Sequence, residues 1–106
     1  MKIEQRKDGA FSVVDDNGTI IVPYGKYDWI DKYQFGYARV KIGKETNGNK
    51  NANVKWGIID ELGTEVVPTI YNDIWNFYGT NWRSTILCLD QREFEFIFST
   101  KQIVHK

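Results

Sequence analysis

Residue types that commonly perform enzyme chemistry are scarce in this sequence of 106 residues. His105 is its one histidine and Cys88 its one cysteine. Catalysis by a serine–histidine or cysteine–histidine pair needs an imidazole held in place, and a residue so near a chain end is rarely held. Zinc sites need several cysteine or histidine ligands. We therefore expect a protein that is not an enzyme, with no metal site and no cofactor.

Carboxylates are the remaining candidates for acid–base chemistry. Asp15 and Asp60 each precede a glycine by three residues, Gly18 and Gly63. An aspartate at the start of a hairpin turn accepts hydrogen bonds from backbone N–H groups downstream, and glycine supplies the positive φ that such a turn needs. The first of these segments also lacks the alternating ligands and distal glutamate of an EF-hand calcium loop. We interpret all four residues as turn formers.

Aromatic and basic side chains provide the candidates for a binding surface. Three tryptophans lie in or beside connections between expected strands, where rings can form a ligand platform or plug the ends of a small barrel; we favour plugging. Residues 37–55 hold five Lys or Arg against one acid, whereas residues 56–82 hold four acids and no Lys or Arg. The candidates for a ligand or partner surface are Trp29, Trp75, Trp82, Tyr37, Arg39, Lys41 and Lys55.

Three classes of ligand follow from these residues. The first is a protein partner, the second a carbohydrate or other small ligand at the tryptophans. The third is single-stranded nucleic acid along Arg39, Lys41 and Lys55 with Tyr37 for stacking. The net charge of zero makes nucleic acid or an anionic membrane an unlikely partner and leaves self-association unopposed. The leading hypothesis is a protein-interaction or scaffold module.

An internal repeat must position these residues. Residues 11–23 and 56–68 align without gaps at an offset of 45. After a slip of one residue the alignment resumes with Tyr27 over Tyr71, and after a further slip of one residue Phe35-Gly36 lies over Tyr78-Gly79. A third, degraded copy runs from Phe94 to Val104 without the turn glycine. The repeat units span about 11–42, 56–89 and 94–104.

Each full copy has the pattern of a β-hairpin that ends at a proline. Pro23 and Pro68 should end the second strand of each hairpin, because proline cannot donate a hydrogen bond to a ladder. The Tyr-x-x-Ile step after each proline is expected to form one helical turn or a bent connection. Trp56 is expected in the core. Further strands are predicted by alternation or by continuous apolar character at 37–42, 84–89 and 93–98.

These strands predict one all-β domain over residues 1–106. We expect an antiparallel hairpin or meander repeat that forms a small barrel-like or rolled sheet of about eight strands, with at most single helical turns. The polar stretch 43–53 is expected to be a surface loop. Cys88 is expected to be a small buried hydrophobe. The sequence shows no signal peptide, no membrane span and no possible internal disulfide, so we expect a cytoplasmic protein.

The second copy contains the segment Lys-Trp-Gly-Ile-Ile-Asp from Lys55 to Asp60, followed by Gly63, Val66-Val67-Pro68, Tyr71 and Ile74. In these residues it resembles the WG-repeat family of bacterial proteins. The first copy departs from the signature, with Phe11-Ser12 in place of Trp-Gly. The resemblance covers residues 11 to about 79. It implies a β-rich repeat scaffold used for binding, without shared catalytic residues, and such a fold does not settle the function.

Overall fold

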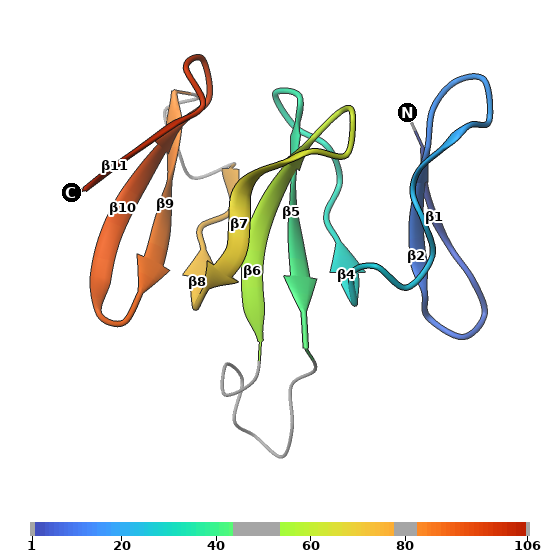
Figure 1. Ribbon diagram of the computed structural model, residues 1–106, viewed down its shortest axis with the longest axis horizontal. Coiled ribbons are helices and arrows are strands. Elements are labelled where there is room, and N and C mark those ends of the chain that lie inside the picture. Colours follow the sequence, from blue (N-terminus) through green and yellow to red (C-terminus); the bar gives the residue numbers. More distant parts are fainter. Residues whose placement is uncertain (1, 44–53, 78–82, 106) are drawn as a thin grey trace.

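The computed structural model describes residues 2–43, 54–77 and 83–105. In this part of the chain, eleven β-strands form three antiparallel sheets that stand in a row, with the two termini at opposite ends (Figure 1). The prediction of an all-β, antiparallel fold is confirmed. The strands are more numerous than the eight or so expected, since several are only two to four residues long. None of the described residues belongs to a helix long and apolar enough to cross a membrane.

The three sheets follow one another along the chain. The first contains β1 (Lys2–Gln5), β2 (Phe11–Val14) and β3 (Ile20–Val22). The second contains, in spatial order, β4 (Trp29–Ile30), β5 (Tyr37–Ile42), β6 (Lys55–Asp60) and β7 (Glu65–Tyr71). The third contains, also in spatial order, β8 (Asp73–Ile74), β9 (Ser84–Leu89), β10 (Arg92–Ile97) and β11 (Gln102–His105).

The sequence repeat and the sheets are offset by half a unit. The copy that begins at Phe11 gives β2 and β3 to the first sheet and then β4 and β5 to the second. The copy that begins at Trp56 gives β6 and β7 to the second sheet and then β8 and β9 to the third. Strands β10 and β11, in the degraded copy, complete the third sheet. Each full copy therefore joins two neighbouring sheets.

The two glycine turns have the same geometry. Asp15 Oδ1 accepts hydrogen bonds from the N–H groups two and four residues ahead, both at 2.9 Å. Asp60 Oδ1 does the same at 2.9 and 3.0 Å. Gly18 and Gly63 have φ of 83° and 79°. All four residues therefore lie in the turns of the two hairpins, with the aspartates as hydrogen-bond acceptors and the glycines at positive φ.

The two prolines take different positions. Pro23 directly follows β3, as predicted. Pro68 lies inside β7, so the prediction that it ends the strand is wrong. Residues 68–70 of β7 lie opposite the single residue Gly57 of β6. Within such a bulge the ladder is already interrupted, so proline can be accommodated without breaking its regular pattern.

The same bulge explains the glycine of the Trp-Gly pair. A Cβ atom at Gly57 would lie 2.8 Å from the carbonyl oxygen of Val67, closer than real Cβ atoms approach. In the first copy the equivalent residue is Ser12, which is buried and donates its hydroxyl to the carbonyl oxygen of Val22 at 2.9 Å. Where the first copy has Ser12 in place of glycine, a side-chain hydrogen bond thus links β2 to β3, the counterparts of β6 and β7.

Two apolar cores fill the two junctions between sheets. The core between the first and second sheets contains Val13, Val22, Tyr27, Ile30, Ala38, Val40 and Ile59. The core between the second and third sheets contains Tyr37, Ile58, Val67, Tyr71, Ile74, Phe77, Leu87, Phe96 and Phe98. Neighbouring residues of β6, Ile58 and Ile59, thus belong to different cores. The second sheet is packed on both faces.

The Tyr-x-x-Ile step bends and then enters a two-residue strand. Ile30 and Ile74 lie in the two-residue strands β4 and β8, which pair with the strands that follow them. Tyr27 and Tyr71, three residues earlier, are buried with them in the two cores. Of the two alternatives expected, the helical turn is wrong and the bent connection agrees with the structure, in which bends at Tyr27, Asp28 and Asn72 lead into strands that pair with the next strand.

The outer face of the third sheet differs from the matching face of the second. Strand pairing shows that Glu93 and Glu95 of β10 hold the places that Trp56 and Ile58 hold in β6. The middle sheet buries its aliphatic and aromatic side chains against a neighbour, whereas the last sheet presents carboxylates. The outer face of the third sheet is therefore the more polar of the two faces.

We expect Gly63→Ala to lower the free energy of unfolding more than Gly18→Ala. Both glycines have positive φ, so each alanine incurs a backbone cost of about 1–2 kcal/mol. At residue 63 the added Cβ would also lie 2.8 Å from Ile21 Cγ2, whereas nothing lies within 4 Å of it at residue 18. Urea denaturation of both variants measures the difference. Equal losses would show that the turn at Gly63 does not press against the first sheet.

Two tyrosines at the core between the first and second sheets donate hydrogen bonds to residues of the second sheet. The Tyr27 hydroxyl donates to Glu65 Oε2 at 2.6 Å, and the Tyr33 hydroxyl donates to the carbonyl oxygen of Asp60 at 2.8 Å. Burial, and then the neighbouring carboxylates, raise the pKa of both phenols well above the ordinary value of 10.0. The folded protein therefore holds these two protons more tightly than the unfolded chain does.

This difference predicts a loss of stability in alkaline solution. The contribution of a raised tyrosine pKa is complete below pH 10 and decreases as the pH rises above it, because only the unfolded chain then releases the proton readily. We expect the free energy of unfolding to fall between pH 9 and pH 11, and to fall less in the Tyr27→Phe/Tyr33→Phe variant. Guanidinium denaturation at both pH values tests this. Parallel losses in the two proteins would contradict it.

Candidate functional site

The structure brings together only some of the residues considered for a binding surface. Trp29, Arg39 and Lys41 lie on one face of the second sheet. Tyr37 lies on the same face but is buried, and its hydroxyl donates to the carbonyl oxygen of Phe98 at 2.6 Å. Its ring packs against aromatic neighbours of the third sheet, so it offers no free face to a nucleic-acid base.

The other three candidates lie elsewhere. Lys55 neighbours Trp56 in β6, and side chains alternate along a strand, so it points away from the face that carries Arg39. Trp75 directly follows β8 and is exposed. Trp82 lies outside the described residues. The predicted basic stripe is therefore divided between two faces of the sheet.

The face with Arg39 carries a compact group of two indoles and two cations, here called the tryptophan–cation cluster: Trp29, Arg39, Lys41 and Trp56. Lys41 pairs with both tryptophans across neighbouring strands, and its Nζ lies 4.6 and 4.9 Å from their ring centres. The Arg39 guanidinium carbon lies 5.6 and 5.0 Å from the same rings. The rings meet edge to face, 5.7 Å apart. Trp56, expected in the core, is half-buried at its margin.

Arg39 directs its hydrogen bonds into the protein. Its Nε and Nη2 lie 2.9 and 2.8 Å from Asp31 Oδ2. Its Nη1 donates to the carbonyl oxygen of Ile74, in β8 of the third sheet, at 2.9 Å. Both partners of the ion pair are largely buried. Arg39 therefore joins the second sheet to the third, which leaves Lys41 as the cluster's less constrained cation.

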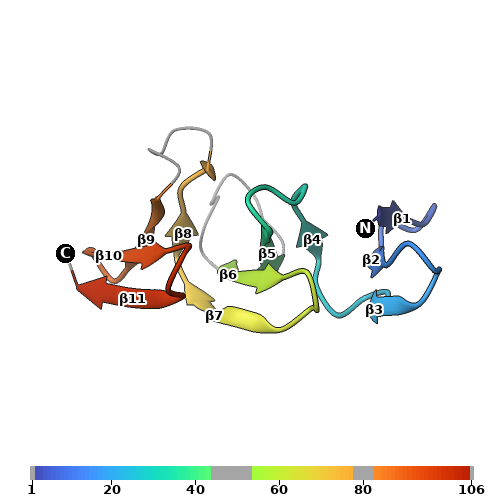
Figure 2. The same ribbon diagram turned by 90° about the horizontal axis from the view of Figure 1, so that it is seen from above.

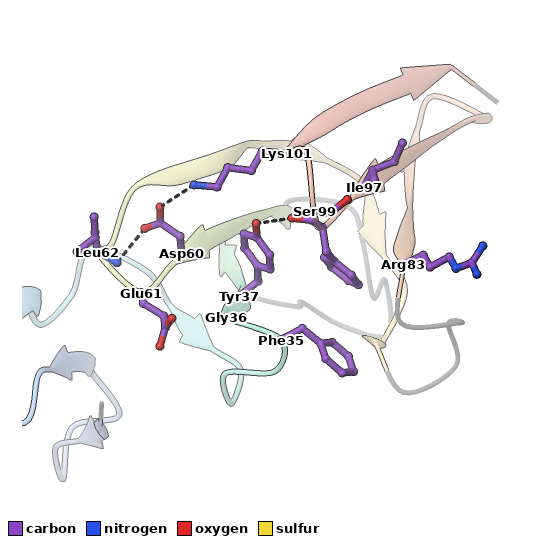
Figure 3. A pocket seen from close by; sticks show the side chains of 11 residues that line it. Phe35, Gly36, Tyr37, Asp60, Glu61, Leu62, Arg83, Ile97, Ser99 and Lys101 are labelled. Carbon is purple, nitrogen blue, oxygen red and sulfur yellow. Dashed lines mark hydrogen bonds and ion pairs between the residues drawn. The ribbon is translucent and has the colours of Figure 1, made fainter.

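A groove of about 790 Å³ opens at the other end of the same junction (Figure 3). Its walls come from the β4–β5 turn at residues 35–37, the β6–β7 turn at 60–62, the β10–β11 turn with residues 97–99 and 101, and Arg83. Segments distant in the sequence thus meet here because the second and third sheets stand side by side (Figure 1).

The groove combines an apolar floor with a charged rim. The rings of Tyr37 and Phe98 stack 5.5 Å apart, and the ring of Phe35 lies 5.7 Å from Phe98 while it remains 46% exposed. On the rim, Lys101 Nζ lies 3.9 Å from Asp60 Oδ2. Such an arrangement, apolar at the centre and polar around it, is typical of protein–protein interfaces.

Phe35 occupies an unfavourable backbone conformation. Phe35 and Gly36 are the central residues of a two-residue hairpin, in which Gln34 and Tyr37 exchange hydrogen bonds of 2.8 and 2.9 Å. Their φ angles are 57° and 84°. A turn with positive φ at both central residues favours asparagine, aspartate or glycine at the first one, and a bulky residue there is strained. Strained residues cluster at binding and active sites.

The groove was not predicted from the sequence. Exposure of Phe35 depends on its turn, and the depth of the groove depends on the third sheet, which the degraded copy completes. One signal was available: an aromatic residue precedes glycine in both full copies, as Phe35-Gly36 and Tyr78-Gly79, although the second pair lies outside the described residues. An aromatic residue before glycine in a two-residue turn would have predicted an exposed ring at residue 35.

Metal binding and thiol reactivity are two further kinds of chemistry to consider in the described part of the chain. No group of three or more His, Cys, Asp or Glu residues there is placed to hold a metal ion. Cys88 is free and half-buried in β9. Burial, and then the charges of Asp73 and Glu93, raise the pKa of its thiol. The reactive thiolate is therefore scarce near neutral pH.

We expect Arg39→Ala to lower the free energy of unfolding by about 3–5 kcal/mol, because it leaves the largely buried Asp31 carboxylate unpaired. Lys41→Ala removes only cation–π contacts and should cost about 1–2 kcal/mol. Urea denaturation of both variants compares the two costs. If Asp31→Asn in the Arg39→Ala background restores no stability, the loss does not arise from the unpaired carboxylate.

Comparison with known proteins agrees with the repeat seen in the structure. The family model described as the WG containing repeat matches residues 11–45 and 56–81, which together make up more than half of the chain. No curated protein and no solved structure matches the chain significantly. The two matched segments begin at Phe11, the first residue of β2, and at Trp56, the second residue of β6. The chain belongs to the family of proteins built from the WG containing repeat.

Proposed function

We propose that this chain is a protein-interaction module that docks a partner polypeptide in the groove between its second and third sheets. The observation that supports this most directly is the position of Phe35. A turn that favours asparagine instead holds an aromatic ring, half-exposed, beside a groove with an apolar floor. Retention of a locally unfavourable residue is understandable if the ring contacts a partner.

The exposed side chains around the groove favour a polypeptide ligand. Leu62, at the tip of the β6–β7 turn, is 81% exposed, where the equivalent residue of the first copy is the polar Asn17. The rim contains acidic and basic groups, including Glu61 and Lys101. A partner segment with an apolar side chain between charged neighbours matches this pattern. Mixed rim charges select among partners more than they add affinity.

Other ligand classes receive less support. Nucleic acid would need exposed cations beside free rings, but Arg39 is bonded to Asp31 and Ile74, and Tyr37 is buried. Carbohydrate would need an open tryptophan face. Arg39 and Lys41 lie over the rings of Trp29 and Trp56, which leaves Trp75 as the more exposed indole among the described tryptophans.

Phe35→Asn should abolish partner capture while the protein stays folded. Asparagine is favoured at this turn position, so relief of the strain, about 1–2 kcal/mol, offsets the loss of the half-buried ring. The free energy of unfolding should change by less than about 1 kcal/mol. A photo-reactive amino acid at residue 62 would report the partner: we expect cross-linked polypeptides in cells that express the otherwise native chain, and loss of these products when Phe35→Asn is added.

Ile20 provides the matched control position. It is 57% exposed in β3 of the first sheet, outside the groove. The same photo-reactive group at residue 20 should not yield the products found at residue 62. The proposal is wrong if residue 62 yields no polypeptide product, if residue 20 yields the same ones, or if the folded Phe35→Asn variant is captured as well as before.

A further inference from the structure

The three sheets have six edge strands, and five of them are blunted. An open edge presents unpaired backbone N–H and C=O groups to other chains, and proteins limit this with short strands, prolines and charged side chains. Strands β4 and β8 contain two residues each. Strand β3 is followed by Pro23, and β7 contains Pro68. Strand β1 carries Lys2 and Glu4.

Strand β11 is as long as β1, and Lys101 directly precedes it, but the strand itself contains no proline and no charged residue. Its residues, Gln102, Ile103, Val104 and His105, include no proline, lysine, arginine, aspartate or glutamate. All four are exposed, and Ile103 and Val104 are each 36% exposed. One side of the strand pairs with β10 along its whole length. The other side forms the outer edge of the sheet.

The position of β11 leaves this edge approachable. Figure 2 shows β11 in the last sheet of the row, on the same side of the molecule as β7 and β3. Among the described strands no other lies beyond β11 in its sheet. An incoming extended chain could therefore continue the antiparallel order of the third sheet.

We propose that this edge binds a second copy of the same chain, with two β11 strands paired antiparallel about a twofold axis. Such pairing is self-complementary, as a twofold interface requires. An antiparallel pair about a twofold axis can set only one residue opposite itself, so β11 would place either Ile103 or Val104 opposite the same β-branched residue of the second copy, a favourable cross-strand combination. The pairing places no like charges opposite one another within residues 102–105, and the net charge of zero adds no general repulsion.

The edge is also favoured over end-to-end stacking of copies. The outer face of the third sheet presents Glu93 and Glu95 where the packed face of the second sheet presents Trp56 and Ile58. Burial of these carboxylates without partners would be costly. Pairing through β11 leaves Glu93 exposed and leaves the half-buried Glu95 with the hydrogen bond that it accepts from the Ser84 hydroxyl. Because a strand of four residues covers little surface, well below the size of permanent interfaces, the dimer should be weak and should depend on concentration.

Sedimentation equilibrium over increasing protein concentration tests the proposal. The average mass of the native chain should rise from that of the monomer toward twice that value. Val104→Lys places a charge on the exposed edge and should keep the mass at that of the monomer. Ile70→Lys is the matched control, since Ile70 is an apolar residue of edge strand β7 and is 48% exposed. This variant should associate as the native chain does.

Amide hydrogen exchange of the native chain gives a second readout that needs no variant. The outward N–H groups of residues 102–105 should exchange more slowly at high protein concentration than at low concentration. The proposal fails if the native chain stays monomeric at every concentration, if folded Val104→Lys associates normally, or if Ile70→Lys also prevents association. It fails equally if the native chain dimerises while exchange in β11 is unchanged.

Discussion

Burial of the second sheet on both faces is the constraint on which the other features depend. Ile58 and Ile59, adjacent in β6, are each fully buried, one in each core. A strand in this situation cannot alternate polar and apolar residues, so the repeat has a continuous apolar run at this position. Gly57, just before the run, permits the close approach of β7. The tryptophan before it lies at the margin of the second core, where Arg39 and Lys41 cover its ring.

The spacing of turn residues predicted the hairpins, whereas most of the features that were not predicted depend on contacts between residues distant in the sequence. The turns at Gly18 and Gly63 follow from aspartate and glycine spacing alone. Strands β4 and β8 are too short to show a period of two and exist because they pair with β5 and β9. Pro68 remains inside β7 because a bulge accommodates it, and the sequence of β7 alone does not reveal a bulge opposite Gly57. The half-unit offset between the repeat copies and the sheets could not be predicted either, because a sequence repeat does not determine which strands pair.

The candidate site was predictable to a smaller extent. Trp29, Arg39 and Lys41 were identified and do meet, but alternation could not show that the carbonyl oxygen of Ile74 would accept a hydrogen bond from Arg39 across the junction. At least one of the basic side chains of residues 37–55, that of Arg39, thus bonds to groups within the protein and is not offered to a ligand. Phe35 was not predicted as a surface residue, because a hydrophobic residue usually indicates a core. Its exposure follows from the backbone geometry of its turn, which forms only on folding. The groove and the β11 edge adjoin, because Lys101 on the rim of the groove directly precedes β11.

The half-unit offset also bears on how such a protein could lengthen during evolution. Because each copy ends partway through a sheet, the seam between consecutive copies is closed by main-chain hydrogen bonds, as between β5 and β6. Duplication of one copy's coding segment would therefore insert a complete new sheet and a complete new junction together. These joining bonds depend little on side-chain identity, so the lengthened protein could fold before its new surfaces diverged.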